Sequence, residues 1–195
     1  MPIQIVEINH EQLAEYCLVP SRFKVHSILR ADLVNGGLGG ILLREESVEE
    51  PYVKDYDSSG ELPSDWPKKF DVTKLGFFLA MDTNKVVGAA SVAFDTTGVF
   101  MLEERRDLSV LWDIRVCPEA RGVGIPLFKY AVEWSRKRMC NQMKVETQNV
   151  NLPACRFYQR MGCRLGEIRR FGYVADPSVA DEVMLCWYLD IKVGQ

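Results

Sequence analysis

The chain has 195 residues, of which 47% are hydrophobic and 26% are charged, and its formal net charge at pH 7 is -3. This length and composition predict a single folded domain over residues 1–195, and they exclude a disordered or fibrous chain. The small negative charge gives no general attraction to nucleic acid or to anionic lipid, so we expect neither nucleic-acid nor membrane partners.

Residues 3–8 alternate apolar and polar side chains, which predicts an edge or half-buried strand. Residues 11–18 and 23–33 are candidates for short helices. Between Arg44 and Trp66 the apolar period disappears, and eight acidic residues accompany two basic ones. This acidic segment is therefore expected to be an exposed insert, either a solvated loop or a flap that attracts a cationic substrate.

The rest of the chain predicts strands interrupted by two helices. A polar turn at residues 82–85 joins the apolar runs 75–81 and 86–94 into a hairpin. Further strands are expected at residues 109–116, 143–147, 164–173 and 182–189, and helices at residues 122–139 and 151–161.

Both helices have clear end signals. Pro126 falls in the first turn of its helix, where the missing N–H removes no hydrogen bond. Asn151 is placed to cap the second helix, and Gly162 follows its end. These signals fix the boundaries of the second helix within a residue or two.

The longest weakly polar stretch, residues 86–94, is far shorter than the ~20 residues that cross a bilayer. The first residues lack the basic start and apolar centre of a secretory signal, so a cytoplasmic protein is expected. The six cysteines form no Cys-x-x-Cys pair, and the two histidines lie near the start of the chain. We therefore expect no disulfide framework and no metal site, and we interpret the cysteines as small buried apolar residues.

Residues 116–124 join the end of a predicted strand to the start of a helix through a turn that contains Gly122 and Gly124. Free N–H groups and the positive end of the helix dipole favour an anion there, and Arg121 adds positive charge. A tight turn alone would have the same sequence, and neither Gly-x-Gly-x-x-Gly nor Gly-Lys-Ser/Thr occurs. The turn by itself is a weak indication of a phosphate site.

Several segments together have the order and spacing of a known superfamily. They are residues 112–116, 121–124, 127–128, 145–158 and 162–163. Over roughly residues 76–190 this pattern resembles the GNAT acetyltransferases. The run from Glu146 to Tyr158 and the late Cys186-Trp187-Tyr188 are most similar to the streptothricin acetyltransferase group.

The resemblance implies a mixed α/β fold, with a central, mostly antiparallel sheet of six to seven strands that is splayed in the middle and has helices on both faces. It implies acetyl-CoA as cosubstrate, no metal, and direct attack by a primary amine of a small cationic molecule in a ternary complex. A protein or peptide amine acetyltransferase and a non-catalytic acyl-CoA-binding module are the alternatives. The oligomeric state is not fixed by the sequence, and a homodimer stays open.

The resemblance also assigns residues to the cofactor. The pyrophosphate would lie on the turn formed by Arg121, Gly122, Val123 and Gly124. Backbone groups of Ile114 and Val116 would hold the pantetheine and the acetyl carbonyl. Asn151 would contact the cofactor from the start of its helix, and Tyr158 would lie beside the thioester sulfur. A phenol beside the thioester sulfur suits a general acid that protonates the leaving thiolate. Plain N-capping by Asn151 and core packing by Tyr158 are the alternative interpretations.

Two positions depart from the family pattern. Glu119 stands where the pattern has Gln or Arg. If Arg121 takes that place instead, Pro126 replaces the final small residue, and either the turn is two residues shorter, which we favour, or the helix starts later. The strand at residues 108–113 has no glutamate, so Asp113 and Glu146 are the candidate general bases. Asp113 alternatively has only a structural role, and an acceptor amine of low pKa needs no dedicated base.

Overall fold

The structure is a computed structural model that describes residues 3–60 and 62–191. Its strands are β1 (Gln4–Ile8), β2 (Phe23–Leu33), β3 (Ile41–Lys54), β4 (Gly76–Asp82), β5 (Lys85–Phe94), β6 (Leu108–Val116), β7 (Gln142–Gln148), β8 (Arg164–Arg169) and β9 (Met184–Asp190). Its α-helices are α1 (Leu13–Tyr16), α2 (Trp66–Lys69), α3 (Gly124–Lys137) and α4 (Leu152–Arg160). Its 3-10 helices are η1 (His10–Gln12), η2 (Asn35–Gly37), η3 (Tyr56–Ser59), η4 (Pro63–Asp65) and η5 (Phe100–Leu102). Within the described ranges, no helix combines the length and the apolar character needed to span a bilayer.

The strands form one seven-stranded sheet and one separate two-stranded sheet. The hydrogen-bonded order of the large sheet is β1-β4-β5-β6-β7-β9-β8, and β2 pairs with β3. β6 and β7 run parallel, whereas β1–β4, β4–β5, β5–β6 and β8–β9 are antiparallel. This confirms the predicted mixed α/β fold with a mostly antiparallel sheet, and it places β1 at an edge.

The large sheet loses its continuity in the middle. The parallel ladder between β6 and β7 covers only the residues from Leu108 to Leu111 on β6, opposite residues 142–145 of β7. Next to this point β6 has a bulge, because Ser91 pairs with Asp113 while Val92 pairs with Leu111, which leaves Trp112 as the additional residue. Among the described residues, β6 has only β5 as a ladder partner from Trp112 onward.

By its internal contacts the chain divides into two compact units. The first comprises the described residues of Met1–Ser21, Asp55–Val145 and Leu189–Gln195, and the second comprises Arg22–Lys54 and Glu146–Tyr188. Each unit is described by itself below. The single domain expected from length stays a prediction.

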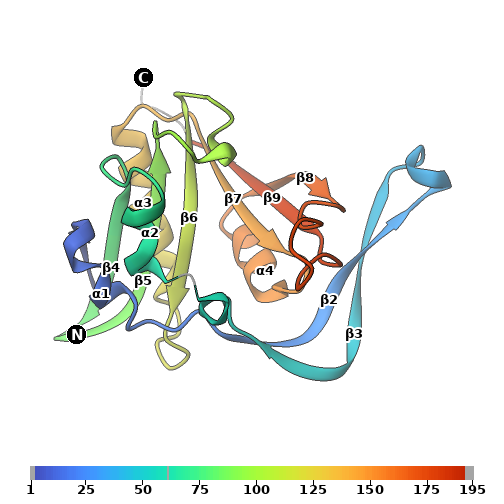
Figure 1. Cartoon of the computed structure of the whole chain (residues 1–195), viewed down its shortest axis with the longest axis horizontal. Coiled ribbons are helices and arrows are strands. Elements are labelled where there is room, and N and C mark those ends of the chain that lie inside the picture. The colour runs from blue at the N-terminus through green and yellow to red at the C-terminus, as the bar shows by residue number, and fades with distance from the viewer. Residues whose placement is uncertain (1–2, 61, 192–195) are drawn as a thin grey trace. The chain divides into compact units, whose positions relative to one another are not determined.

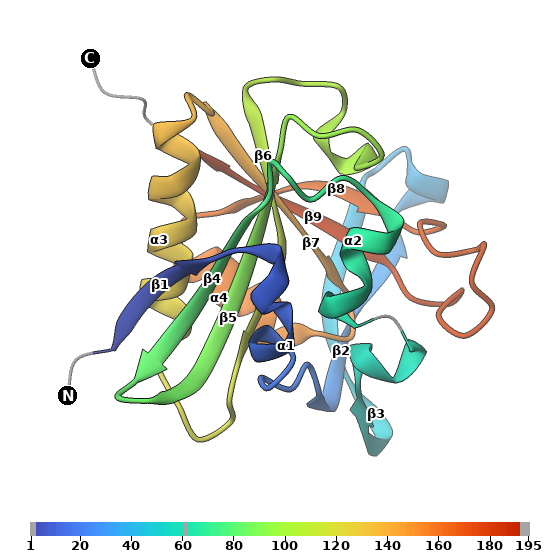
Figure 2. The ribbon, with the colours of Figure 1, turned by 60° about the vertical axis from the view of Figure 1, so that its left-hand side comes forward.

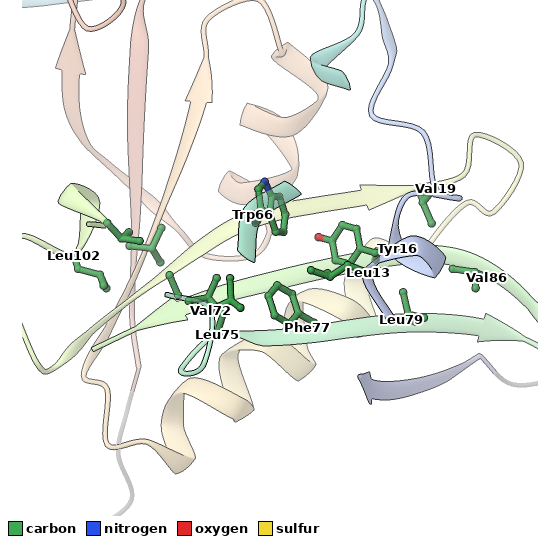
Figure 3. Close-up of a cluster of buried hydrophobic side chains, with 14 of the residues drawn as sticks. Leu13, Tyr16, Val19, Trp66, Val72, Leu75, Phe77, Leu79, Val86 and Leu102 are labelled. Atoms are coloured by element: carbon green, nitrogen blue, oxygen red, sulfur yellow. The ribbon is translucent and has the colours of Figure 1, made fainter. Parts of the chain in front are cut away.

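The core of the first unit follows from the alternation of side chains along β4. Phe77 and Leu79 belong to a buried apolar cluster with side chains of α1 and α2, among them Tyr16 and Trp66 (Figure 3). Phe78 points to the other side of the strand, where its ring lies 5.9 Å from that of Trp134 on α3. Helices therefore cover both faces of this part of the sheet, in which β1, β4 and β5 lie side by side (Figure 2).

In the second unit, Asn149 joins β2 to the segment before β9. Its Nδ2 donates to the Leu29 carbonyl at 2.9 Å, and its Oδ1 accepts from the backbone N–H of Val183 at 2.8 Å. Thr147 contacts Cys155 of α4, with 3.4 Å between Oγ1 and Sγ, and accepts a hydrogen bond from Nε1 of Trp187 at 3.0 Å. These buried contacts fix β2, β7, α4 and β9 within the unit.

Two predictions for the N-terminal third were wrong. Residues 23–33 form the strand β2 instead of a helix, and much of the acidic segment belongs to β3, which pairs with β2 in a long hairpin (Figure 1). A two-stranded ribbon leaves both of its faces largely exposed, so β3 carries charged residues on both sides and has no apolar period. The pairing partners are also distant in the chain, as Leu29 and Glu45 are, and no local pattern indicates them.

Most other elements were predicted correctly. Asn151 caps α4 by accepting a hydrogen bond from the N–H of Ala154 at 3.2 Å, and Gly162 follows the helix with φ +89. Several ends differ by a few residues: α3 spans Gly124–Lys137 instead of residues 122–139, β8 ends at Arg169 instead of residue 173, and β9 begins at Met184 instead of residue 182. Five of the six cysteines are buried free thiols, as expected, whereas Cys17 is only partly buried.

The packing of α3 on β5 requires a glycine at position 88. A Cβ there would lie 2.8 Å from Cδ1 of Leu127 and 3.0 Å from Cγ1 of Val123. We expect Gly88→Ala to lower the free energy of unfolding in urea by about 1–3 kcal/mol through overpacking. In a Leu127→Ala background, where space is available, the same substitution should cost much less. Equal costs in the two backgrounds would contradict this packing.

Candidate functional site

The second half of β6 has an edge without a ladder partner. Leu111, the last residue paired with β7, is 2% exposed, and the following residues of the strand are mostly half-buried. Ile114 and Val116 lie on this stretch and pair with Ala90 and Gly88 of β5. The free N–H and C=O groups of such an edge are suited to an extended ligand that lies along the strand.

The turn after β6 presents backbone N–H groups at the start of α3. Gly122 has φ +88, a conformation that a residue with a Cβ rarely adopts, and a Cβ there would meet open space. No residue in the described chain accepts a backbone hydrogen bond from the N–H of Gly122 or Gly124. Arg121 is exposed and forms no ion pair with any described residue, while Val123 is buried against the fold.

The acid in this turn is neutralised locally. Glu119 forms an ion pair with Lys85 of the β4–β5 hairpin, with Nζ and Oε1 3.1 Å apart. The backbone N–H of Glu119 and the Lys85 ammonium hold the pKa of the Glu119 carboxyl below its ordinary value. Because its charge is matched by Lys85, Glu119 does not cancel the attraction that free N–H groups, the helix dipole and Arg121 exert on a phosphate.

Asp113 belongs to a buried ionic network of the first unit. It accepts hydrogen bonds from Oη of Tyr16 at 2.6 Å and from Nε of Arg115 at 2.8 Å. Nη1 of Arg115 also lies 3.0 Å from Asp57 in η3 and donates to the carbonyl of Val19. The Arg115 side chain is only 5% exposed, so this buried guanidinium is balanced by two partly buried carboxylates.

The network keeps Tyr16 and Arg115 protonated. Burial and the neighbouring Asp113 carboxylate raise the pKa of Tyr16 well above its ordinary value, so the hydroxyl remains a donor. Burial lowers the pKa of Arg115, but its pairing with Asp113 outweighs this and raises the pKa above the ordinary value. Asp113 is therefore committed to Arg115 and Tyr16, which favours its structural interpretation over a general base.

Glu146 lies on β7 in the second unit, where it accepts a hydrogen bond from the hydroxyl of Tyr173. Strand alternation places its side chain on the face opposite Thr147, which contacts α4. Tyr158 is on the buried side of α4, three residues after Cys155, and its ring centroid lies 5.4 Å from that of Phe157. The second unit thus carries Glu146 on β7 and Tyr158 on α4.

The site residues predicted from the sequence are divided between the two units. Those of the first unit are Asp113, Ile114, Val116, Arg121, Gly122, Val123 and Gly124, and those of the second unit are Glu146, Asn151 and Tyr158. The sequence analysis missed Tyr16, Asp57 and Arg115 as partners of Asp113, and Tyr173 as the partner of Glu146. The spacing of Asp113 and Arg115 on one strand face was a signal for their pairing, whereas Tyr16, Asp57 and Tyr173 are too distant in the chain to leave one.

We expect Asp57→Asn to lower the free energy of unfolding in urea by about 2–3 kcal/mol, because it removes one carboxylate from a buried guanidinium. The control is Asp32→Asn on β2, whose partners Arg30 and Arg44 are 58% and 63% exposed. The control should leave the unfolding midpoint nearly unchanged, since solvent screens such pairs. A midpoint of Asp57→Asn close to that of the control would show that the network contributes little.

Comparisons with known proteins agree on one superfamily. The chain is 29% identical to the streptothricin acetyltransferase of Escherichia coli over 185 residues, which is 94% of each protein. It is 27% identical to streptothricin acetyltransferase A of Bacillus subtilis (strain 168) over 144 residues, which is 74% of this chain and 76% of that protein.

Solved structures share the fold. A nourseothricin acetyltransferase superposes with a TM-score of 0.74 at 24% identity, covering 98% of this chain and 100% of the other. A Bacillus anthracis protein in complex with acetyl coenzyme A, assigned provisionally as a streptothricin acetyltransferase, gives 0.76 at 24% identity, covering 97% and 99%. The model of the acetyltransferase (GNAT) family matches residues 41–163. With its fold, its open strand edge and this match over more than half of its length, the chain belongs to the GNAT acetyltransferase family.

Proposed function

We propose that this protein transfers the acetyl group of acetyl-CoA to a primary amine of a small cationic molecule such as streptothricin. The observation that carries the proposal is the free edge of β6 that leads directly into the N–H-lined turn before α3. The named activities of the Escherichia coli and Bacillus subtilis relatives support the choice of acceptor.

In the first unit, the turn formed by Arg121, Gly122, Val123 and Gly124 binds the pyrophosphate. The free N–H groups of the two glycines donate to phosphate oxygens, and the exposed guanidinium of Arg121 adds charge. The backbone groups of Ile114 and Val116 on the free edge of β6 hold the pantetheine and the acetyl carbonyl, since an amide-containing chain can pair with them like an additional strand.

In the second unit, Asn151 and Tyr158 are the residues that the family pattern assigns to the cofactor. Asn151 caps α4, and we infer an additional contact with the cofactor from the family pattern. Tyr158 is 4% exposed, and a buried phenol next to a thioester sulfur is shielded from competing water. Its role is that of a general acid.

The reaction needs three proton transfers. Glu146 takes one proton from the acceptor ammonium, and the neutral nitrogen then attacks the thioester carbonyl carbon. As the C–N bond forms, the C–S bond breaks, and Tyr158 gives its hydroxyl proton to the departing sulfur. The proton that the nitrogen loses when it becomes an amide restores the Tyr158 hydroxyl. The products are the acetylated amine and the free thiol, and no covalent enzyme intermediate is formed.

Glu146 is our preferred base because Asp113 is engaged with Arg115 and Tyr16. If a carboxylate that pairs with a buried guanidinium took up a proton, the positive charge of the guanidinium would be left unbalanced. We therefore assign Asp113 to the support of β6 next to the bulge. Transfer of the proton to Glu146, in contrast, leaves no buried cation without a partner among its described contacts.

A cationic acceptor is also favoured by charge. The exposed acids of β3 include Glu49 and Glu50, and they give this hairpin a negative local field that attracts cations at low ionic strength. Asp55 and Asp57, by contrast, have structural partners, because Asp55 accepts from Ser21 and Asp57 pairs with Arg115. On β3, Glu45 and Glu46 also form ion pairs, with Arg156 and Arg30, so Glu49 and Glu50 are the acids of this strand without an ion pair among the described residues.

The proposal is tested by the release of thiol from acetyl-CoA in the presence of streptothricin. We expect turnover by the natural chain and, for Tyr158→Phe, a kcat lower by on the order of 100-fold, which is the usual contribution of a general acid. The thermal stabilisation by acetyl-CoA should be the same in both proteins, because the ring and its packing remain.

Two results would contradict the proposal in different ways. Full turnover by Tyr158→Phe would leave Tyr158 as a core aromatic residue and assign protonation of the sulfur to another group. Stabilisation by acetyl-CoA without thiol release, with streptothricin and with a panel of peptide and small-molecule amines, would indicate a non-catalytic acyl-CoA-binding module.

A further inference from the structure

We propose that Glu146 and Gln148 form the subsite that binds the ammonium group of the acceptor, and that Tyr173 is a positioning residue for Glu146. The inference rests on the proposed function and adds to it the atoms that recognise the acceptor. All three residues belong to the second unit.

Glu146 and Gln148 point to the same side of β7, because they are two residues apart on a strand. The residue between them, Thr147, points to the opposite side, where it contacts Cys155 of α4 and Trp187 of β9. The two side chains therefore face away from α4. On their own side, the hydroxyl of Tyr173 reaches Glu146 from the segment that follows β8.

The side-chain oxygen of Gln148 is the observation that indicates a ligand. Oε1 of Gln148 is buried and has no hydrogen-bond partner among the described residues. A buried acceptor left unpaired costs about 1–3 kcal/mol, and proteins seldom retain one without a reason. An amide oxygen can only accept, so the group that satisfies it must be a donor.

An ammonium group fits the two acceptors. The Cα atoms of residues two apart on a strand are about 6.6 Å from each other, and a nitrogen with N···O distances of about 2.9 Å spans at most about 5.8 Å between two oxygens. The flexible ends of the two side chains therefore need to lean together by only about 1 Å for one nitrogen to bind both. Glu146 supplies the negative charge that selects a protonated amine over an alcohol. Once Glu146 has taken one proton, an N–H that remains on the neutral amine still bonds to Gln148.

Tyr173 fixes the direction of the Glu146 carboxylate. Its hydroxyl donates to Oε1 of Glu146, and a carboxylate has about four acceptor positions, so several remain for the ammonium. Without this hydrogen bond the carboxylate would rotate more freely about its last bond. Tyr173 thus acts through Glu146 and does not itself need to touch the substrate.

The first test is Gln148→Met, which keeps the length of the side chain and removes the acceptor. We expect the KM for streptothricin to rise at least tenfold, because a hydrogen bond to a charged group is lost, while the KM for acetyl-CoA stays the same. The Tm should stay the same or rise, because an unsatisfied buried acceptor has been removed. A structural role for Gln148 would give the opposite pattern, with a lower Tm and an unchanged KM.

The second test is Tyr173→Phe, with Tyr188→Phe as the matched control. The hydroxyl of Tyr188 on β9 also donates to a glutamate, Glu167 on β8, which has no place in the proposed subsite. We expect Tyr173→Phe to lower kcat with streptothricin about tenfold and to leave the KM for acetyl-CoA unchanged. The control should have the kinetics of the natural chain. Equal kinetics for both variants would overturn the role of Tyr173.

These experiments separate the subsite from the proposed function. If the natural chain acetylates streptothricin and Gln148→Met does so with the same KM, the subsite is wrong and the function stands. If no amine is acetylated but calorimetry detects streptothricin binding that Gln148→Met weakens tenfold, the subsite stands and the function is wrong. Absence of both turnover and streptothricin binding would overturn both.

Discussion

The additional residue at Trp112 is the constraint on which the rest of the structure depends. It interrupts the register between β5 and β6 at the point where the parallel ladder from β6 to β7 also ends. A bulge bends its strand and changes the direction of the groups that follow, so β6 keeps one partner and gains a free edge. That edge continues into the glycine-containing turn, which places free backbone N–H groups at the start of α3. Cofactor binding, as proposed, thus uses main-chain groups that the break in the sheet leaves without partners.

An interrupted strand needs support, and the ionic network supplies it. Asp113 and Arg115 follow the bulge directly and share one side of β6, where Tyr16 of α1 and Asp57 of η3 complete the hydrogen bonds. A buried ion pair is weak evidence for net stability, but its hydrogen bonds permit few other arrangements of the segments that carry the paired groups. It therefore ties two loop-rich segments to the strand at the place where the regular ladder is lost. The carboxylate of Asp113 is therefore engaged in the fold, which is why we propose Glu146 as the base.

The sequence predicted those elements whose signals are local. The cap at Asn151, the glycine at position 162 and the apolar runs of β4 and β5 each act within a few residues, so their structures follow from propensity and spacing. The hairpin of β2 and β3 was mistaken for a helix and a loop because each strand depends on a partner about twenty residues away. The candidate site shows the same division. Gly122 and Gly124 were found from their own pattern, whereas the partners of Asp113 and Glu146 come from distant segments.

Hydrogen–deuterium exchange with and without acetyl-CoA tests most directly whether the cofactor occupies the free edge of β6. The amides of Ile114 and Val116 and those of the turn at Gly122 and Gly124 should exchange at least tenfold more slowly at saturating acetyl-CoA, because the ligand accepts from them or covers them. The paired amides of β4, which are already protected by neighbouring strands, should change little. Unchanged exchange across residues 112–124, in a protein that acetyl-CoA demonstrably stabilises, would contradict this placement of the cofactor.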